Sequence, residues 1–331
     1  MTTNQTEGLK NLETYVFQNA SNIKGIVVLK NGQLLYENYR DGFTAKDTVH
    51  VMSVTKSVVS LLIGIALSQG LIKSIEQPVL DFFPEYTVKR GEKTIQSVTL
   101  RHLLTMTAPY KYRSEPWTKI CTSPNWTTAT LDILGGKRGL TGEFKYSTLG
   151  VHILTGIISK QSGLTTVDYA NKYLFEPMGI ARHTEFVAKN AQEHKQFTIS
   201  KAPKTDVWFS APDGVATAGY GLCLSPMDMA KLGQLCLDEG FYDGSSIVPA
   251  QWIRESTSPH IQSGKTFGNM HYGYMWWIPT DDVNIYAALG NSGNVIYVNK
   301  KTQLVVGVAS TFKPSVIDRV QFIQNHIEPF V

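Results

Sequence analysis

Strand-forming sequence stands at both ends of this 331-residue chain, and that arrangement limits the folds open to it. Near the start, residues 25–30 and 33–37 are apolar runs on either side of Asn31-Gly32, which is the strongest local signal for a β-hairpin. Near the end, turn residues separate β-branched and aromatic segments at 272–278, 284–289, 295–299 and 303–310. We therefore expect one antiparallel sheet to which both ends of the chain contribute strands.

The middle of the chain has no strongly alternating segment, and its pattern predicts helices. These are short stretches joined by loops with Pro, Trp and Gly, at residues 99–104, 131–134, 149–161 and 166–174. Further helices are expected at residues 9–19, 53–67 and 316–327, and from Ser225 onward. The sequence thus predicts an α+β fold, with one antiparallel sheet flanked by helices and an inserted all-helical domain. We expect residues 1–74 and 205–331 to form the α/β domain and residues 75–204 the helical domain.

Composition and charge exclude several classes of function. With 42% hydrophobic and 18% charged residues, the chain has the composition of a globular protein and not of a disordered one. The net charge of +4 comes from scattered lysines and arginines, so we expect no nucleic-acid partner. The first residues lack the apolar segment of a secretory signal, and the longest apolar run, 58–67, is too short for a bilayer. These features predict a cytoplasmic protein without a membrane anchor.

The cysteines point to neither disulfides nor zinc. Cys121, Cys223 and Cys236 are odd in number and widely spaced, so we expect free, buried thiols.

Ser53-Val54-Thr55-Lys56 stands at the start of the segment that predicts a buried helix. Positions three apart share a helix face, so Lys56 would lie beside the Ser53 hydroxyl. A lysine in apolar surroundings loses solvation, its pKa falls, and it can act as the base that a serine nucleophile needs. The unpaired first-turn N–H groups could stabilise an oxyanion. The same spacing recurs at Ser21-Asn22-Ile23-Lys24, where no helix follows, so the motif needs partners elsewhere.

Two later segments supply such partners. Tyr146 precedes a helix predicted to begin near Leu149, and its hydroxyl could shuttle protons if a neighbouring lysine lowers its pKa. Residues 290–294, Gly-Asn-Ser-Gly-Asn, lie between two predicted strands. The glycines would let a substrate lie along the strand edge, and the Asn294 N–H could complete an oxyanion hole.

In the order of these three motifs, the chain resembles the class C β-lactamase superfamily of serine hydrolases. That group includes penicillin-binding proteins, D-peptidases, family VIII carboxylesterases and 6-aminohexanoate-oligomer hydrolases. Framework stretches are similar as well, at residues 102–107, 173–180, 228–234 and 272–277, so the resemblance covers most of residues 24–310. It implies an antiparallel sheet flanked by helices plus a helical domain, with the active site between the two domains.

Carried over by position, the resemblance implies a role for each matching residue. Ser53 would be the nucleophile, Lys56 its base partner and Tyr146 the proton shuttle to the leaving group. The amides of Ser53 and Asn294 would form the oxyanion hole. No metal and no organic cofactor are implied.

Two departures from the family pattern bear on the substrate. Thr148 stands where the family often has an Asn that would contact the substrate's acyl side chain. Asn291 stands where β-lactamases and D-Ala-D-Ala peptidases carry a Lys or His that helps to hold a carboxylate. A charge-assisted hydrogen bond is about twice as strong as a neutral one, so neutral esters or amides fit this chain better than β-lactams. The expected substrate-binding residues are Thr148, Asn291, Ser292 and Gly293.

The sequence therefore favours a serine hydrolase that acts through a Ser53 acyl-enzyme on a small ester, amide or short peptide. A D-amino-acid peptidase or weak β-lactamase would use the same chemistry, and a non-catalytic penicillin-binding sensor or scaffold would keep only the fold. Structural roles also stay open, with Ser53 as a helix cap, Lys56 as a surface residue and Tyr146 as a packing residue. Four aromatic residues could line a pocket or pack in the core: Tyr110, Tyr112, Trp117 and Trp126.

Overall fold

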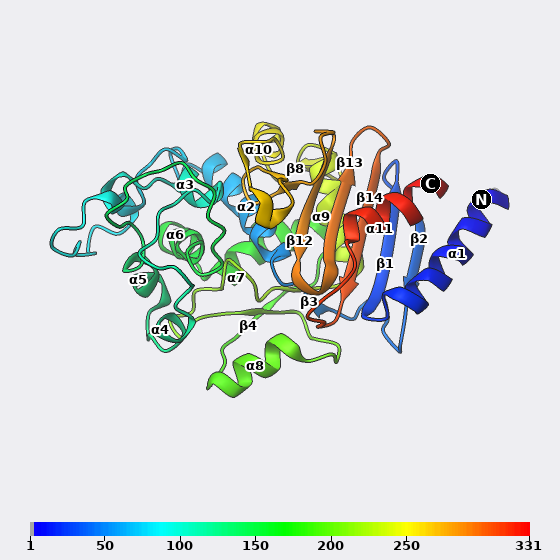
Figure 1. Cartoon of the computed structure of the whole chain (residues 1–331), viewed down its shortest axis with the longest axis horizontal. Helices are drawn as coiled ribbons and strands as arrows, with labels where there is room; N and C mark the ends of the chain where they lie inside the picture. Colours follow the sequence, from blue (N-terminus) through cyan, green and yellow to red (C-terminus); the bar gives the residue numbers. More distant parts are fainter. Residues whose placement is uncertain (1–2) are drawn as a thin grey trace.

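A computed structural model describes residues 3–331, and its central element is an eight-stranded sheet in the order β2-β1-β14-β13-β12-β11-β10-β9 (Figure 1). The strands are β1 (Ile23–Lys30), β2 (Gln33–Tyr39), β9 (Ile261–Gln262), β10 (His271–Tyr272), β11 (Trp277–Ile278), β12 (Ile285–Gly290), β13 (Asn294–Asn299) and β14 (Leu304–Ser310). All neighbouring pairs are antiparallel, and β1 pairs with β14 from the opposite end of the chain. The prediction of one sheet built from both chain ends is confirmed.

The turn between β1 and β2 follows the predicted hairpin. Asn31 and Gly32 have φ of 52° and 73°, the left-handed values that a tight two-residue turn requires. Gly adopts such values without steric cost, and Asn more readily than most residues.

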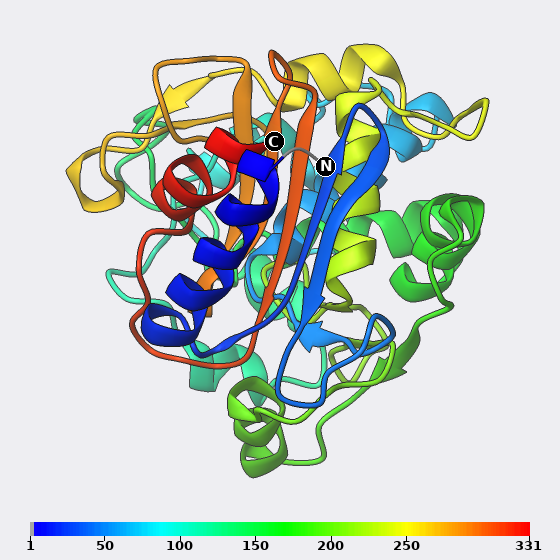
Figure 2. The same cartoon turned by 90° about the vertical axis from the view of Figure 1, so that its right-hand side faces the viewer.

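The sheet separates two apolar layers, because side chains of a strand alternate between its faces. In β1, Ile26 and Val28 pack with α1 (Thr3–Asn19) and α11 (Arg319–His326). Val27 and Leu29 lie in the opposite core, with α2 (Val54–Ser68) and α9 (Pro226–Leu237). Figure 2 shows α1 and α11 on the near face of the sheet and α9 behind it. The chain thus forms a helix–sheet–helix sandwich whose inner layer contains the helix that follows Ser53.

The middle of the chain lies beside this sandwich (Figure 1), and its regular secondary structure is mostly helical. Its helices are α3 (Leu100–Leu104), α4 (Trp117–Cys121), α5 (Trp126–Leu131), α6 (His152–Ser162), α7 (Thr166–Ala170) and α8 (Ala191–Ile199), and α10 (Ala250–Ser256) follows later. Small strand pairs complete the fold: β3 (Val49–His50) with β6 (Cys223–Leu224), β4 (Thr184–Phe186) with β5 (Val207–Phe209), and β7 (Phe241–Tyr242) with β8 (Ser245–Ser246). Helix α6 contacts α2, which connects the helical region to the sandwich.

Three local predictions are wrong. Residues 131–134 do not form a helix, since α5 ends at Leu131 and Leu134 forms a bridge with Tyr110. Residues 272–278 form the paired strands β10 and β11 and not one strand, because the chain turns near Met275, whose φ is 65°. The strand β4 lies within the segment predicted to be all-helical and pairs with β5. The domain limits at residues 74/75 and 204/205 stay a prediction.

Within residues 3–331, no helix combines the length and the apolar character that a membrane crossing requires. The three cysteines are free, with Cys223 and Cys236 buried and Cys121 partly exposed.

Candidate active site

The structure brings Ser53 and Lys56 together at the start of α2. Met52 has a left-handed φ of 53°, and Ser53 precedes the first residue of the helix without capping it through its side chain. Lys56 Nζ donates hydrogen bonds to Ser53 Oγ at 3.0 Å and to the Gly219 carbonyl oxygen at 2.7 Å. Only 1% of Lys56 is exposed. Ser53 therefore stands at the N-cap position without a capping bond from its side chain, and the surface interpretation of Lys56 is wrong.

Burial governs the protonation of Lys56. Loss of solvation lowers the pKa of its amine to about 7, and the negative charge of Glu115 partly opposes that shift. The amine is therefore substantially neutral at pH 7 and above, in the state that can accept a proton. The sequence-based prediction of a depressed lysine pKa is confirmed.

Tyr146 lies beside the same pair. Lys56 Nζ is 4.7 Å from the centroid of the Tyr146 ring, and that ring packs against Phe267 and Trp277, with centroids 5.4 and 5.8 Å away. Burial raises the pKa of Tyr146, and a hydrogen bond with Ser53 offsets this only in part. The expectation that a lysine would lower this pKa is wrong, because desolvation of the phenolate dominates and the negative charge of Glu115 raises the pKa further. Tyr146 is a neutral phenol and can donate a proton.

The end of β12 and the start of β13 lie against the residues before Ser53. A Cβ on Gly290 would overlap the Val51 carbonyl oxygen and lie 3.3 Å from Met52 Cβ, so only glycine permits this approach. The Asn294 side chain holds the strand here, since its Nδ2 donates to the His50 carbonyl at 3.4 Å and its Oδ1 accepts from the Ser310 amide at 2.8 Å. Within residues 3–331 the Ser53 amide has no acceptor. Residue 294 is thus fixed against His50, in the segment that leads to Ser53.

The four predicted substrate-binding residues divide into two pairs. Thr148 and Asn291 line a cavity of about 900 Å³ together with Ser53. Ser292 is buried, and its hydroxyl bonds both the carbonyl and the amide of Lys313, at 3.2 and 3.0 Å. Gly293, with φ of 83°, leaves room for the Arg319 side chain. The last two residues shape the turn, and a direct substrate contact for them stays a prediction without geometric support.

Aromatic side chains form much of the cavity wall. Trp117 and Trp126 line it, whereas Tyr110 belongs to the core, Tyr112 packs against that core, and both tyrosines line a different cavity. Several wall residues were not predicted from the sequence, namely Met52, Val187, Phe209 and Tyr220. Tyr220 is fixed by a hydrogen bond of 2.9 Å between its hydroxyl and Nε2 of His194, in α8. The cavity next to Ser53 therefore favours an apolar substrate group.

Two further elements of the site escaped prediction. Glu115 Oε1 accepts hydrogen bonds from Ser147 Oγ at 2.8 Å and from the amides of Thr148 and Leu149 at 2.6 and 2.9 Å. The Gly219 carbonyl anchors Lys56, and a Cβ on Gly219 would overlap the Thr148 carbonyl oxygen. Neither residue belongs to a local pattern, since one is a single carboxylate in a loop and the other acts through its backbone.

A family model described as Beta-lactamase matches residues 16–325. The chain belongs to the beta-lactamase family. The resemblance and the fold class expected from the sequence are confirmed, and membership indicates a hydrolase of the beta-lactamase-related type.

Known proteins similar to this beta-lactamase-family chain include enzymes with different names. The 6-aminohexanoate-dimer hydrolase of Paenarthrobacter ureafaciens is 24% identical over 299 residues, which span 85% of this chain and 70% of that protein. A solved family VIII carboxylesterase has a TM-score of 0.72 and 13% identity, covering 99% of this chain and 98% of the other. A beta-lactamase/D-alanine carboxypeptidase from Pseudomonas syringae has a TM-score of 0.71 and 16% identity, covering 99% and 100%. At such identities the two structures share the fold alone.

Proposed function

We propose that this protein is a serine hydrolase that cleaves neutral esters or amides through an acyl-enzyme on Ser53. One observation carries the proposal: the buried Lys56 amine, with a pKa lowered to about 7, donates at 3.0 Å to the Ser53 hydroxyl. A serine needs a base to accept its proton, and a neutral amine in hydrogen-bond contact is one. A penicillin-binding scaffold without catalysis would not need a lysine held in this costly buried state.

Each proton has a route in the proposed reaction. Lys56 takes the Ser53 proton as Oγ bonds to the substrate carbonyl carbon, and the amides of Ser53 and Asn294 stabilise the oxyanion. The neutral Tyr146 phenol gives its proton to the leaving alcohol or amine as the C–O or C–N bond breaks, and Lys56 returns a proton to Tyr146. Water then attacks the acyl-enzyme by the same steps in reverse and releases the carboxylic acid.

The substrate class follows from the cavity. Asn291 offers a hydrogen bond but no cation for a substrate carboxylate, and the two lysines that line the cavity, Lys189 and Lys195, are exposed to solvent. Aromatic residues also line the cavity wall. A small ester with an apolar acyl group is therefore our first choice. A neutral amide is the second candidate, and similarity to the protein named 6-aminohexanoate-dimer hydrolase supports amide cleavage. D-peptides and β-lactams, which carry carboxylates, fit less well.

Three substrates assayed side by side test the proposal: p-nitrophenyl butyrate, the uncharged amide N-butylbutanamide and nitrocefin. We expect turnover of the ester, slower cleavage of the amide and little of nitrocefin. A fluorophosphonate probe should modify Ser53, as located by mass spectrometry. Ser53→Ala should lower ester turnover on the order of 10³-fold or more.

Ser21→Ala is a matched control, because Ser21-Asn22-Ile23-Lys24 repeats the motif spacing on an exposed serine without a following helix. It should leave all rates unchanged. A probe adduct on another residue, or wild-type protein that hydrolyses none of the three substrates, would contradict the proposal. Nitrocefin turnover faster than that of the ester would favour a β-lactamase instead.

A further inference from the structure

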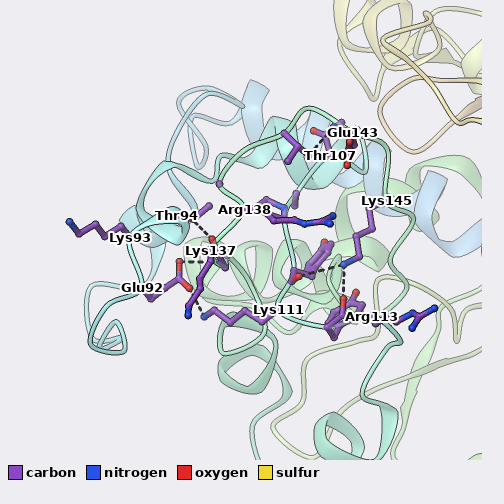
Figure 3. Close-up of a pocket in the computed structure, with 18 of the residues that line it drawn as sticks. Glu92, Lys93, Thr94, Thr107, Lys111, Arg113, Lys137, Arg138, Glu143 and Lys145 are labelled. Atoms are coloured by element: carbon purple, nitrogen blue, oxygen red, sulfur yellow. Dashed lines mark hydrogen bonds and ion pairs between the residues drawn. The ribbon is translucent and has the colours of Figure 1, made fainter.

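A second cavity, of about 1200 Å³, lies in the helical region (Figure 3), and neither Ser53 nor Tyr146 lines it. Three segments line it, at residues 89–94, 107–113 and 135–145. Eight of its lining residues are Lys or Arg and two are Glu, so their net charge is +6, whereas the net charge of the whole chain is +4. The net charge of all the other residues is therefore −2. Lysines and arginines that are scattered in the sequence thus give this second cavity a positive net charge.

The carboxylates around this cavity do not neutralise it. Glu92 pairs with Lys111 at 3.2 Å and accepts hydrogen bonds from the amides of Ile95 and Gly136, so its charge is already engaged. Lys89 pairs with Asp132 at 3.0 Å. The other six cations form no ion pair with any carboxylate of residues 3–331. They are therefore available to a ligand.

Arg138 and Lys145 are the central pair of this group. Figure 3 shows the Arg138 side chain extending from its loop toward Lys145 across the cavity. Lys145 Nζ is held in place by a hydrogen bond of 2.7 Å to the Tyr112 carbonyl and lies 4.6 Å from the Tyr112 ring centroid. Burial lowers the pKa of Lys145, and the charge of Arg138 lowers it further. An anion between the two groups would turn this repulsion into attraction.

The loop that presents Arg138 is held in a defined conformation. Gly135 and Gly136 have φ of 94° and 125°, values that residues with a Cβ rarely adopt. A Cβ on Gly135 would also overlap the Glu92 carboxylate. Thr94 Oγ1 donates to the Gly136 carbonyl at 2.7 Å, which ties the loop to the neighbouring segment. A site ordered before binding loses less conformational entropy when it takes up a ligand.

We propose that this cavity binds a small compound with several phosphate or sulfate groups. Guanidinium and ammonium groups are the side chains that hydrogen-bond such oxygens best, and a single inorganic ion would fill only a fraction of the space. The cations surround one concavity and do not form a stripe along a face, so a compact polyanion matches them better than a nucleic-acid strand.

Isothermal titration with inorganic tripolyphosphate, at constant ionic strength, tests the site. Wild-type protein should bind one equivalent, and Ser53→Ala should bind equally, which separates this site from the proposed hydrolase site. The double variant Lys137→Gln/Arg138→Gln should bind about tenfold more weakly or worse, since it removes two cations from the cavity. The matched double variant Lys46→Gln/Lys201→Gln removes two exposed lysines elsewhere and should change the affinity by less than about twofold.

Several results would overturn the proposal. The proposal fails if titration of the wild-type protein with tripolyphosphate gives no measurable heat and no shift of its thermal unfolding midpoint. Equal weakening by both double variants would show general charge attraction and no specific site. Binding of heparin without any binding of tripolyphosphate would show a surface for polymers. Circular dichroism checks the fold of each variant, and the single change Lys93→Gln, at an exposed position, replaces the double variant if that does not fold.

Discussion

The Thr148 amide donates a hydrogen bond of 2.6 Å to the Glu115 carboxylate, which joins the loop before α4 to the segment that follows Tyr146. The same oxygen accepts from the Leu149 amide and the Ser147 hydroxyl. One carboxylate thus satisfies three donors of a chain turn, as side chains do at helix N-termini. Glu115 acts as a positioning residue for Tyr146, and its charge also raises the pKa of Lys56.

Two substitutions of Glu115 separate its geometry from its charge. Glu115→Gln keeps an oxygen for the donors but removes the charge, so the ester rate should stay within about threefold and the apparent pKa of Lys56 should fall. Glu115→Ala leaves the donors unpaired and should lower kcat by roughly 10–100-fold, because small displacements of reacting groups are costly. Profiles of the ester hydrolysis rate against pH give kcat and the apparent pKa of Lys56 for both variants. Identical profiles for wild type and Glu115→Gln would contradict the electrostatic role.

Ester hydrolysis should depend on pH through Lys56. The amine accepts a proton only when neutral, so kcat/KM should rise with pH up to a pKa of about 7 and then level off. Below that pKa the slope of log kcat/KM against pH should be about one. Rates for p-nitrophenyl butyrate between pH 5 and 9 measure it. Lys56→Arg, whose guanidinium stays protonated, should abolish the activity over the whole range, and a flat wild-type profile would contradict the role of Lys56.

Lys56 should also make stability depend on pH. Its folded pKa lies below that of a lysine in the unfolded chain, so the unfolded state binds an extra proton between about pH 7 and 10.4. Stability should therefore fall as pH is lowered across that range. Lys56→Met should remove this dependence and be about 1–3 kcal/mol more stable than wild type near pH 6.5. Urea unfolding of the two proteins at pH 6.5 and 9.5 measures the pH dependence and the stability difference. If the free energy of unfolding changed equally with pH in wild type and Lys56→Met, Lys56 would not be the source of the dependence.

Tyr146→Phe should affect amides more than activated esters. An amine leaving group must be protonated as it departs, whereas p-nitrophenolate leaves without a proton. We expect the amide rate to fall by about 10²–10⁴-fold and the ester rate much less. Kinetics with N-butylbutanamide and with p-nitrophenyl butyrate give the ratio. Equal losses on both substrates would indicate that Tyr146 only packs against Phe267 and Trp277.

Asn291→Lys should shift the preference toward substrates that carry a carboxylate. A cation at this exposed edge of the cavity would form a charge-assisted bond, so KM for nitrocefin should fall by about tenfold. KM for the uncharged p-nitrophenyl butyrate should not change. Asn291→Met is the control, since it has a similar length without charge. If Asn291→Met and Asn291→Lys alter nitrocefin binding alike, charge at position 291 does not set the preference.

Local sequence patterns were sufficient to predict several structural features of this protein. Asn31-Gly32 predicted its hairpin, and Ser225, with Asp228 three residues later, predicted the start of α9. The spacing of Ser53 and Lys56 predicted that the two side chains meet, because a helix places them on one face. Such features depend on residues within one turn or one hairpin, and the sequence contains all of them.

Only the tertiary structure decided the rest, because burial and long-range contacts depend on which segments meet. Gly219 and Glu115 belong to the site only because distant loops pack against α2 and Tyr146. Tyr146 has a raised pKa where a neighbouring lysine suggested a lowered one, since its desolvation is a property of the packed site. Lysines and arginines with no pattern along the chain gather around one cavity for the same reason. The sequence determines the local geometry, and the fold determines which groups lose their water and which charges become neighbours.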